Sequence, residues 1–345
     1  MTSAPAAPSS HVARLDKAQG VSKPGFFFFG ANRRSGTTWL TTMLNSHPEV
    51  MIRNEGWFLN EHGCSVEQWL DAGMFRKWAE LPAAQGGWLR EIPVEDAWTI
   101  ATRAMMEAIM REAAARTPWK KLSNLKMIGD KTTTFFCTKS ETLHRLFPEA
   151  KFIHMVRDGR DVVVSDMFLK FRYKDFKFAG QGEETRAAAE QAYRFHAEKQ
   201  GDPVPLLGEG AIRNLAGTWV ESIRGGERAR ELFGENYLEV RYEDLLNDPW
   251  KVREVFAFLG VSTGEKLIKD CIERNTFEKQ AGGRKPGESD PTHPSRKGIA
   301  GDWRNHFTED NVRVFKEVAG RELKALGYES DDAWAVDNVT ATTVS

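Results

Sequence analysis

The chain of 345 residues has little cysteine and no long apolar stretch. Its three cysteines, Cys64, Cys137 and Cys271, are widely spaced and form no C-x-x-C pair, which argues against a disulfide framework and a zinc site. No apolar run approaches the length of a membrane span, and the small, polar N-terminus has no apolar signal segment. We therefore expect a protein of the reducing cytoplasm, without a transmembrane segment.

Positive charge is not in excess either. The chain carries 48 Lys and Arg against 49 Asp and Glu, a formal net charge of −1. Because a general nucleic-acid binder normally carries a basic excess, this balance argues against nucleic acid as a partner. With 41% hydrophobic and 28% charged residues, the composition is that of an ordinary globular protein.

The sequence also lacks an internal repeat and any linker rich in Pro, Gly or Ser that would divide it. We expect a disordered lead-in over residues 1–24, a single domain over residues 25–328, and a loose tail over residues 329–345. The length is sufficient for this domain to bury a core.

Short apolar runs alternate with amphipathic helical patterns along the domain. The runs are typical of buried strands and cover residues 25–31, 127–129, 151–157 and 237–241. One helix stops before Pro48, and another, over residues 310–326, follows an N-cap at Thr308. A further helix is expected to bury one face, made of Trp98, Ala101, Met105, Ala108 and Ile109. The alternation predicts an α/β fold with a central, mostly parallel sheet covered by helices on both faces.

The stretch FFFFGANRRSGTTWL, residues 26–40, combines a buried strand, a glycine turn and a helix start. The first free N–H groups of that helix, together with the side chains of Ser35, Thr37 and Thr38, suit an anion. Arg33 and Arg34 add charge, and Arg34 stands where the Walker motif would have its lysine. By itself the pattern also fits a solvated basic turn that caps a core helix.

Two later segments favour the anion site. One is a buried strand ending at Arg157, followed by a helix that carries Ser165, and the other is the run Arg296-Lys297-Gly298. Together with RYEDLLNDP at residues 241–249, these motifs resemble, in order, those of the sulfotransferase family. The donor of that family is 3′-phosphoadenosine 5′-phosphosulfate (PAPS). The family's loop P-K-S-G-T-T-W-L is matched by residues 33–40, and the similarity covers roughly residues 25–325.

The resemblance implies a P-loop-like, three-layer fold and roles for the residues of the loop. Ser35, Gly36, Thr37 and Thr38 would contact the 5′-phosphate. Arg34 would lie near the bridging oxygen, where a fixed cation stabilises the charge left by sulfuryl transfer. Arg33 replaces the family's common proline and is either a donor contact or a solvated bystander.

The resemblance also implies the rest of the donor site. The 3′-phosphate, which distinguishes PAPS from ATP, would be held by Arg157, Ser165, Arg296, Lys297 and Gly298. The nucleotide would be contacted by three aromatic residues, which otherwise are core residues: Trp39, Tyr242 and Phe277. PAPS is thus the implied co-substrate, and this chemistry needs no metal.

The catalytic histidine of cytosolic family members has no counterpart in this sequence. Their K-T-H segment corresponds to residues 131–133, so Lys131 carries over as a cation that contacts the sulfuryl group, whereas Thr133 is no base at neutral pH. Bacterial and Golgi-type relatives use a glutamate after the first helix instead. We expect Glu55 to be the general base, with Glu61 and His62 as alternatives.

The acceptor side would be built from stretches that do not look like family core, about residues 56–124 and 170–210. Their mixture of aromatic and basic residues suits a small-molecule or glycan hydroxyl, and it fits a solvated helical face equally well. We predict a sulfotransferase that moves the sulfuryl group of PAPS in line to a hydroxyl, giving PAP and a sulfate ester. A homodimer is compatible with the family.

Two other functions are kept as alternatives. A P-loop kinase shares the strand–loop–helix logic but needs a Walker lysine and Mg²⁺ ligands that the sequence does not show. A catalytically inactive nucleotide-binding module is consistent with the absent histidine.

Overall fold

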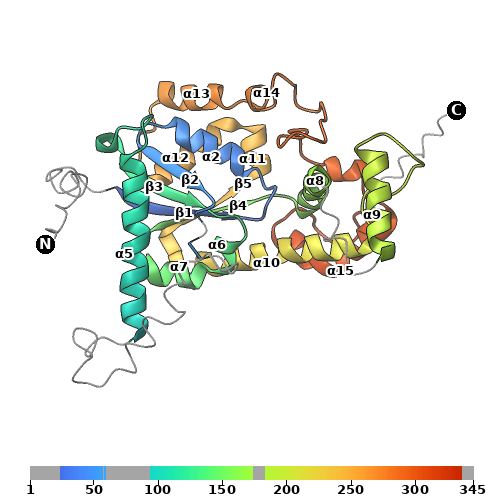
Figure 1. Ribbon diagram of the computed structural model, residues 1–345, viewed down its shortest axis with the longest axis horizontal. Coiled ribbons are helices and arrows are strands. Elements are labelled where there is room, and N and C mark those ends of the chain that lie inside the picture. The colour runs from blue at the N-terminus through green and yellow to red at the C-terminus, as the bar shows by residue number, and fades with distance from the viewer. Residues whose placement is uncertain (1–23, 57, 60–93, 174–182, 336–345) are drawn as a thin grey trace, which may run out of the picture.

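The computed structural model describes residues 24–56, 58–59, 94–173 and 183–335. Its centre is a sheet with the strand order β2-β3-β1-β4-β5, in which every pairing is parallel (Figure 1). The strands are β1 (Gly25–Ala31), β2 (Val50–Asn54), β3 (Met127–Lys131), β4 (Lys151–Val156) and β5 (Tyr237–Arg241). The predicted α/β fold with a central parallel sheet is confirmed.

Helices cover both faces of this sheet. On one face lie α5 (Val94–Ala115), α6 (Phe135–Thr138), α7 (Ser140–Leu146) and α10 (Glu209–Phe233). On the other face lie α2 (Thr37–Ser46), α11 (Tyr242–Asn247), α12 (Val252–Leu259) and α13 (Glu265–Arg274).

The phenylalanines of β1 are divided between the two faces. Phe26 and Phe28 pack with α5, α7 and α10, whereas Phe27 and Phe29 pack with α2 and α12. Successive side chains of a strand point to opposite faces, so a run of four phenylalanines requires an apolar cover on both sides. Strand β1 is therefore the centre of the three layers.

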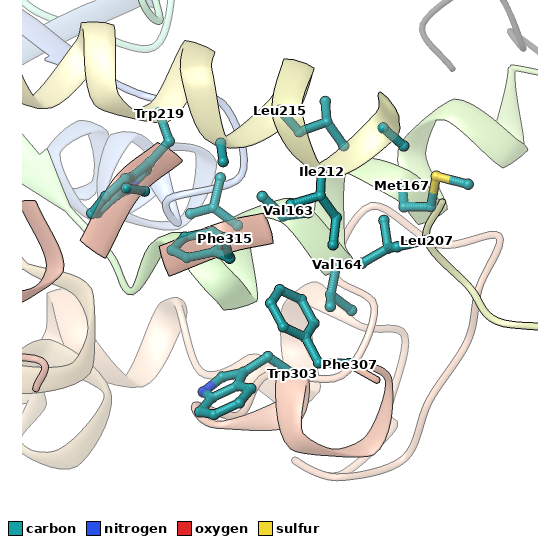
Figure 2. Packing of buried hydrophobic residues seen from close by; sticks show 14 of the residues in the cluster. Val163, Val164, Met167, Leu207, Ile212, Leu215, Trp219, Trp303, Phe307 and Phe315 are labelled. Carbon is teal, nitrogen blue, oxygen red and sulfur yellow. The ribbon is translucent and has the colours of Figure 1, made fainter. Parts of the chain in front are cut away.

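A third apolar cluster lies to one side of the sheet and supports the rest of the site. It joins α10 to α8 (Gly159–Arg172), α9 (Glu183–His196) and α15 (Glu309–Ala325). Figure 2 shows the large rings of this cluster, where Phe315 packs against both Trp219 and Phe307. This packing holds α8 and the segment before α15 against each other.

The predicted helix boundaries agree with the structure in two places. Helix α2 ends at Ser46, two residues before Pro48. Helix α15 follows Thr308, whose side chain accepts a hydrogen bond from the N–H of Asn311 in a capping box. Both signals are local, which is why they can be read from sequence.

The predicted apolar face of the helix around Trp98 is wrong in part. Trp98 is buried, but Ala108 is exposed and Ile109 is 46% exposed, while Met106 and Met110 point into the core. The buried residues of α5 recur at intervals of four from Trp98, because the orientation of the helix on the sheet selects that stripe.

Two further features of the fold differ from the sequence-based prediction. Strand β2 was not expected, because it is a short edge strand that ends in the polar residues Arg53 and Asn54. The described part of the predicted loose tail, residues 329–335, is mostly exposed but is anchored at two points: Glu329 pairs with Arg160, and Trp334 is buried in the third cluster.

Candidate active site

A cavity of about 320 Å³ opens beyond the carboxyl ends of the strands. It is lined from the loop after β1 and from the end of β4, the two neighbouring strands between which the chain order of the sheet reverses. Such switch points are where open parallel sheets bind ligands. Most of the predicted donor residues line it: Arg34, Gly36, Thr37, Thr38, Trp39, Arg157, Ser165, Tyr242, Phe277, Arg296, Lys297 and Gly298.

The loop between β1 and α2 is shaped for a close approach to the backbone. Gly36 has φ 87°, and a Cβ at this position would lie 2.4 Å from the ring of Tyr242. Ser35 is buried, and its Oγ has no hydrogen-bond partner within the described part of the chain. Because a buried hydroxyl without a partner is costly, this orphan together with the start of α2 suits an anion at the loop.

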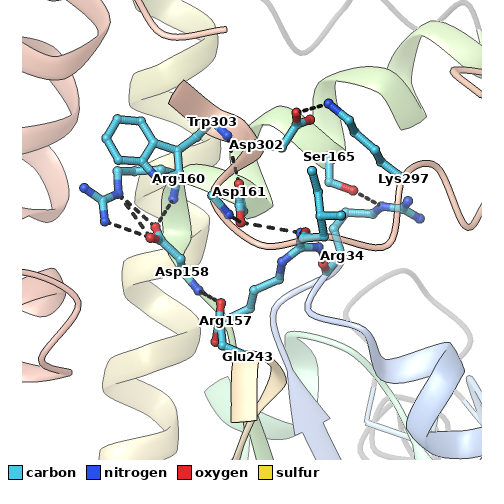
Figure 3. Close-up of polar contacts among 12 residues, drawn as sticks. Arg34, Arg157, Asp158, Arg160, Asp161, Ser165, Glu243, Lys297, Asp302 and Trp303 are labelled. Atoms are coloured by element: carbon cyan, nitrogen blue, oxygen red, sulfur yellow. Dashed lines mark hydrogen bonds and ion pairs between the residues drawn. The ribbon is translucent and has the colours of Figure 1, made fainter. Parts of the chain in front are cut away.

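Arg34 does not point along the loop. Its backbone is left-handed, with φ 69°, and its guanidinium crosses to α8, where Nε donates to Ser165 Oγ at 3.0 Å (Figure 3). Nη2 donates to the carbonyl oxygen of Pro294 at 2.8 Å. Burial lowers the pKa of Arg34 to about 10, with nearby Asp166 opposing the shift and Arg157 adding to it.

Arg157 follows the last residue of β4 and contacts three other segments of the chain, at Arg34, Ile299 and Tyr242. Its Nη1 donates to the carbonyl oxygen of Arg34 at 2.9 Å, and its Nη2 donates to that of Ile299 at 3.2 Å. Its guanidinium lies over the ring of Tyr242 at 4.4 Å. Its Nε is buried and has no partner among the described residues, so a donor remains for a ligand.

The segment that carries Arg296 and Lys297 is held by Asp302. This carboxylate pairs with Arg296 and, at 2.6 Å, with Lys297. Burial opposes its ionisation, but bonds from His306, Arg296 and Lys297 outweigh burial and hold the pKa of Asp302 well below its ordinary value. Asp302 thus remains anionic and keeps both cations at the cavity.

Two aromatic residues shape the walls of the cavity. A Cβ on Gly298, which has φ 64°, would lie 2.3 Å from the ring of Phe277. Trp39 Nε1 donates to the carbonyl oxygen of Asn275 at 2.8 Å, which fixes the indole. Asn275 also lines the cavity. The sequence indicates it only through its position two residues before Phe277, a predicted nucleotide contact.

Arg33 and Ser35 do not line the cavity. The side chain of Arg33 is 45% exposed and pairs with Asp166 at 3.1 Å. The structure thus places Arg33 in a partly solvated ion pair, the arrangement expected of a bystander.

The predicted catalytic pair lies at the same edge of the sheet, at the ends of β2 and β3. Lys131 Nζ is 2.6 Å from Glu55 Oε1, and Thr133 Oγ1 donates to the same oxygen at 3.4 Å. Glu55 has φ 53°, and its N–H donates to the carbonyl oxygen of Lys131 at 2.7 Å. Glu55 Oε2 is buried without a partner among the described residues. Neither residue lines the cavity.

Asp130 is a buried acid beside this pair and is not among the predicted site residues. Its Oδ1 accepts from the N–H of Gly56 at 3.1 Å, and its Oδ2 accepts from Thr132 Oγ1 at 2.9 Å. Burial raises the pKa of Asp130 to about 7, and the charge of Glu55 adds to the shift. No sequence motif identifies Asp130 as a site residue, because its burial comes from packing around the turn at Gly56.

Several expectations fall outside the described residues, namely Glu61, His62 and the parts of the predicted acceptor elements over residues 60–93 and 174–182. Across the described ranges, no cluster of three or more His, Cys, Asp or Glu side chains could hold a metal ion. In the same ranges, no helix is both long and apolar enough to cross a membrane.

Two human proteins are similar in sequence to this chain. Human sulfotransferase 2A1 is 27% identical over 192 residues, which cover 50% of this chain and 60% of that protein. Human sulfotransferase 2B1 is 27% identical over 52% of this chain and 46% of that protein. The chain therefore spans less than two thirds of the length of these relatives.

Solved structures of sulfotransferases are also similar. Mouse sulfotransferase SULT7A1 complexed with PAP gives a TM-score of 0.46 at 17% identity, covering 89% of this chain and 86% of that one. A sulfotransferase from Alicyclobacillus acidocaldarius gives 0.44 at 18% identity, covering 91% and 99%. The model of the "Sulfotransferase family" matches residues 24–265, more than two thirds of the sequence. The chain belongs to the sulfotransferase family.

Proposed function

We propose that the protein transfers the sulfuryl group of PAPS to a hydroxyl acceptor, releasing PAP and a sulfate ester. The observation that carries this proposal is the gathering of cations and unpartnered donors around one cavity. The loop after β1, Arg157 after β4, Ser165 on α8 and residues 296–298 all reach it. A nucleotide with anionic groups at both its 3′ and 5′ positions matches such a distribution.

The residues present fit this donor. Arg157 Nε and Arg296 Nε belong to residues that line the cavity, are buried and lack partners among the described residues, so each is a donor that an anion would satisfy. Ser35 Oγ, in the loop after β1, is a further buried donor without a partner in these residues. Trp39 and Phe277 offer aromatic faces for an adenine. PAPS, when bound, would supply the group that is transferred.

The chain's own residues would then do two things. Lys131 and the loop donors hold negative charge where it develops, which stabilises the transition state. Glu55, whose Oε2 is unpartnered in the described part of the chain, takes the acceptor's proton as the acceptor oxygen bonds to sulfur. Lys131 holds the carboxylate in place through their ion pair.

The first experiment compares shifts in melting temperature with PAP, 5′-ADP and ATP–Mg²⁺. At 100-fold excess over Kd, a ligand of the folded state adds about 2.7 kcal/mol of stability. A shift with PAP that 5′-ADP does not reproduce is expected, followed by transfer of label from [³⁵S]PAPS to hydroxyl compounds. A preference for ATP–Mg²⁺ would favour a kinase, and PAP binding without any turnover would favour an inactive binding module.

A further inference from the structure

We infer that Asp130 is a positioning residue for the reaction: its buried carboxyl group holds the turn at Gly56 and thereby fixes the direction in which Glu55 presents Oε2 to the acceptor. This inference rests on the proposed function, in which Glu55 is the general base. Asp130 does not itself line the donor cavity, so it would act on the reaction through Glu55.

The backbone of Glu55 has to be held by other parts of the chain. Its left-handed conformation, with φ 53°, is uncommon for a residue with a Cβ and persists only where the surroundings impose it. The N–H of Glu55 donates to the carbonyl oxygen of Lys131 at 2.7 Å. The N–H of the next residue, Gly56, donates to Asp130 Oδ1 at 3.1 Å. The peptide N–H groups on both sides of the Glu55 Cα are therefore bonded to β3, one through its main chain and one through the side chain of Asp130.

Two successive residues of β3 hold this turn from opposite faces of the sheet. Asp130 is level with Phe28 of β1, which packs on the face covered by α5. Lys131 is level with Phe29, which packs on the face covered by α2. Lys131 binds Oε1 of Glu55, whereas Asp130 binds the backbone that follows it. With Oε1 in the ion pair, the backbone bond decides where Oε2 points.

The carboxyl group of Asp130 is itself fixed and fits closely against the turn. The residue is 2% exposed, and its Oδ2 accepts from Thr132 Oγ1 at 2.9 Å. A Cβ on Gly56 would lie 2.8 Å from Asp130 Oδ1, so the turn has no room to move toward the carboxyl group. A buried carboxyl group is costly unless its oxygens are bonded, and both oxygens here are used to join the turn to the end of β3.

The test measures kcat with labelled PAPS and the hydroxyl compound that accepts most label in the experiment above. Asp130→Ala removes the bond to Gly56 and should lower kcat by about 10- to 100-fold, because the base is then misplaced. Asp130→Asn keeps an oxygen for Gly56 and should retain kcat within a few-fold of wild type. Both variants should bind PAP with wild-type affinity in calorimetry. Amide hydrogen exchange at Gly56 should quicken about tenfold in Asp130→Ala but not in Asp130→Asn, as expected for the loss of one hydrogen bond.

Dependence on Glu55 separates positioning from a general loss of stability. In a double-variant cycle, Asp130→Ala should slow the Glu55→Gln protein little, since the base is already absent. Leu143→Ala is the matched control, because it removes a fully buried side chain of α7 and should lower the melting temperature while kcat is kept. If Asp130→Ala does not fold, Gly56→Ala disturbs the same bond from the other side, and the same fall in kcat is expected.

Three results would overturn the role of Asp130 alone: a wild-type kcat in the variant that breaks this bond, an equal fall in the Glu55→Gln background, or a parallel loss of PAP affinity. A wild-type rate in Glu55→Gln would overturn Glu55 as the base, and this inference with it. A protein that transfers no label from PAPS to any hydroxyl compound would overturn the proposed function itself.

Discussion

Lys131 and Glu55 stand opposite each other at the carboxyl ends of β3 and β2, with Nζ and Oε1 2.6 Å apart. A second pair, Lys126 and Glu49, lies just before the same two strands, with 3.0 Å between Nζ and Oε1. Two lysine–glutamate pairs thus lie at opposite ends of one strand pair. Only the first lies at the carboxyl edge, where parallel sheets bind ligands.

The variant Glu55→Gln tests the general base. It should lower kcat by about 10²–10⁴-fold, as the loss of a general base typically does, and leave PAP affinity near the wild-type value. Steady-state rates with PAPS and calorimetry with PAP measure the two effects. Glu49→Gln removes a carboxylate from the pair at the other end of the strands and should keep its kcat. A rate of Glu55→Gln within a few-fold of wild type would assign the proton to another group.

Lys131→Met tests whether Lys131 and Glu55 act together in catalysis. The lysine side chain is only 7% exposed, so its removal leaves a carboxylate without its counter-charge and removes a cation from the site. We expect a fall in kcat of about 10²-fold, comparable to the loss of one transition-state donor. The double variant with Glu55→Gln should be no slower than the worse single variant.

A four-member cycle of wild type, both single variants and the double variant measures this coupling, with Lys126→Met as the control for a lost lysine. If the two losses multiply in the double variant, the residues act independently and the proposed unit does not exist.

Gly298→Ala should distort the cavity wall. Its new Cβ would meet the ring of Phe277, whereas Gly282 has a similar φ of 68° and nothing within 4 Å of the corresponding atom. The two alanine variants share the strain of a positive φ, and the clash should cost Gly298→Ala a further 1–3 kcal/mol or so, typical of overpacking. Melting temperatures and PAP affinities of both variants measure the difference. Matching values would mean that Phe277 moves freely.

Asp130→Asn tests the buried acid through pH. Since the folded-state pKa is raised to about 7, the native protein keeps this proton while the unfolded chain loses it near the ordinary value. The contribution of Asp130 to stability therefore falls as pH rises from about 4 to 7, by up to about 1.4 kcal/mol per pH unit. The melting temperature of Asp130→Asn relative to wild type should rise over that window and level off above it.

Asparagine can keep the bond from Gly56 but loses the oxygen that accepts from Thr132. That loss does not depend on pH, so the trend with pH reports the charge. Asp96→Asn on the exposed side of α5 is the control and should show no such trend. A constant difference between Asp130→Asn and wild type from pH 5 to 8 would show that Asp130 does not titrate in this range.

The features that could be predicted from sequence are those set by a few neighbouring residues. The unbroken run Phe26–Phe29 requires burial on both faces, and Thr308 caps a helix by bonding to Asn311 three positions away. Motif spacing likewise indicated which loops would meet, because the carboxyl ends of parallel strands share one edge of the sheet.

Only the tertiary structure decided where long side chains and short edge elements go. Arg34 bonds to Ser165, which is 131 positions away, rather than following its own loop. The buried stripe of α5 and the packing of Trp334 depend on the surface that each meets. Asp130 is buried by a turn on the neighbouring strand. Local propensity does not contain these contacts, since their energies come from partners brought together only when the chain is folded.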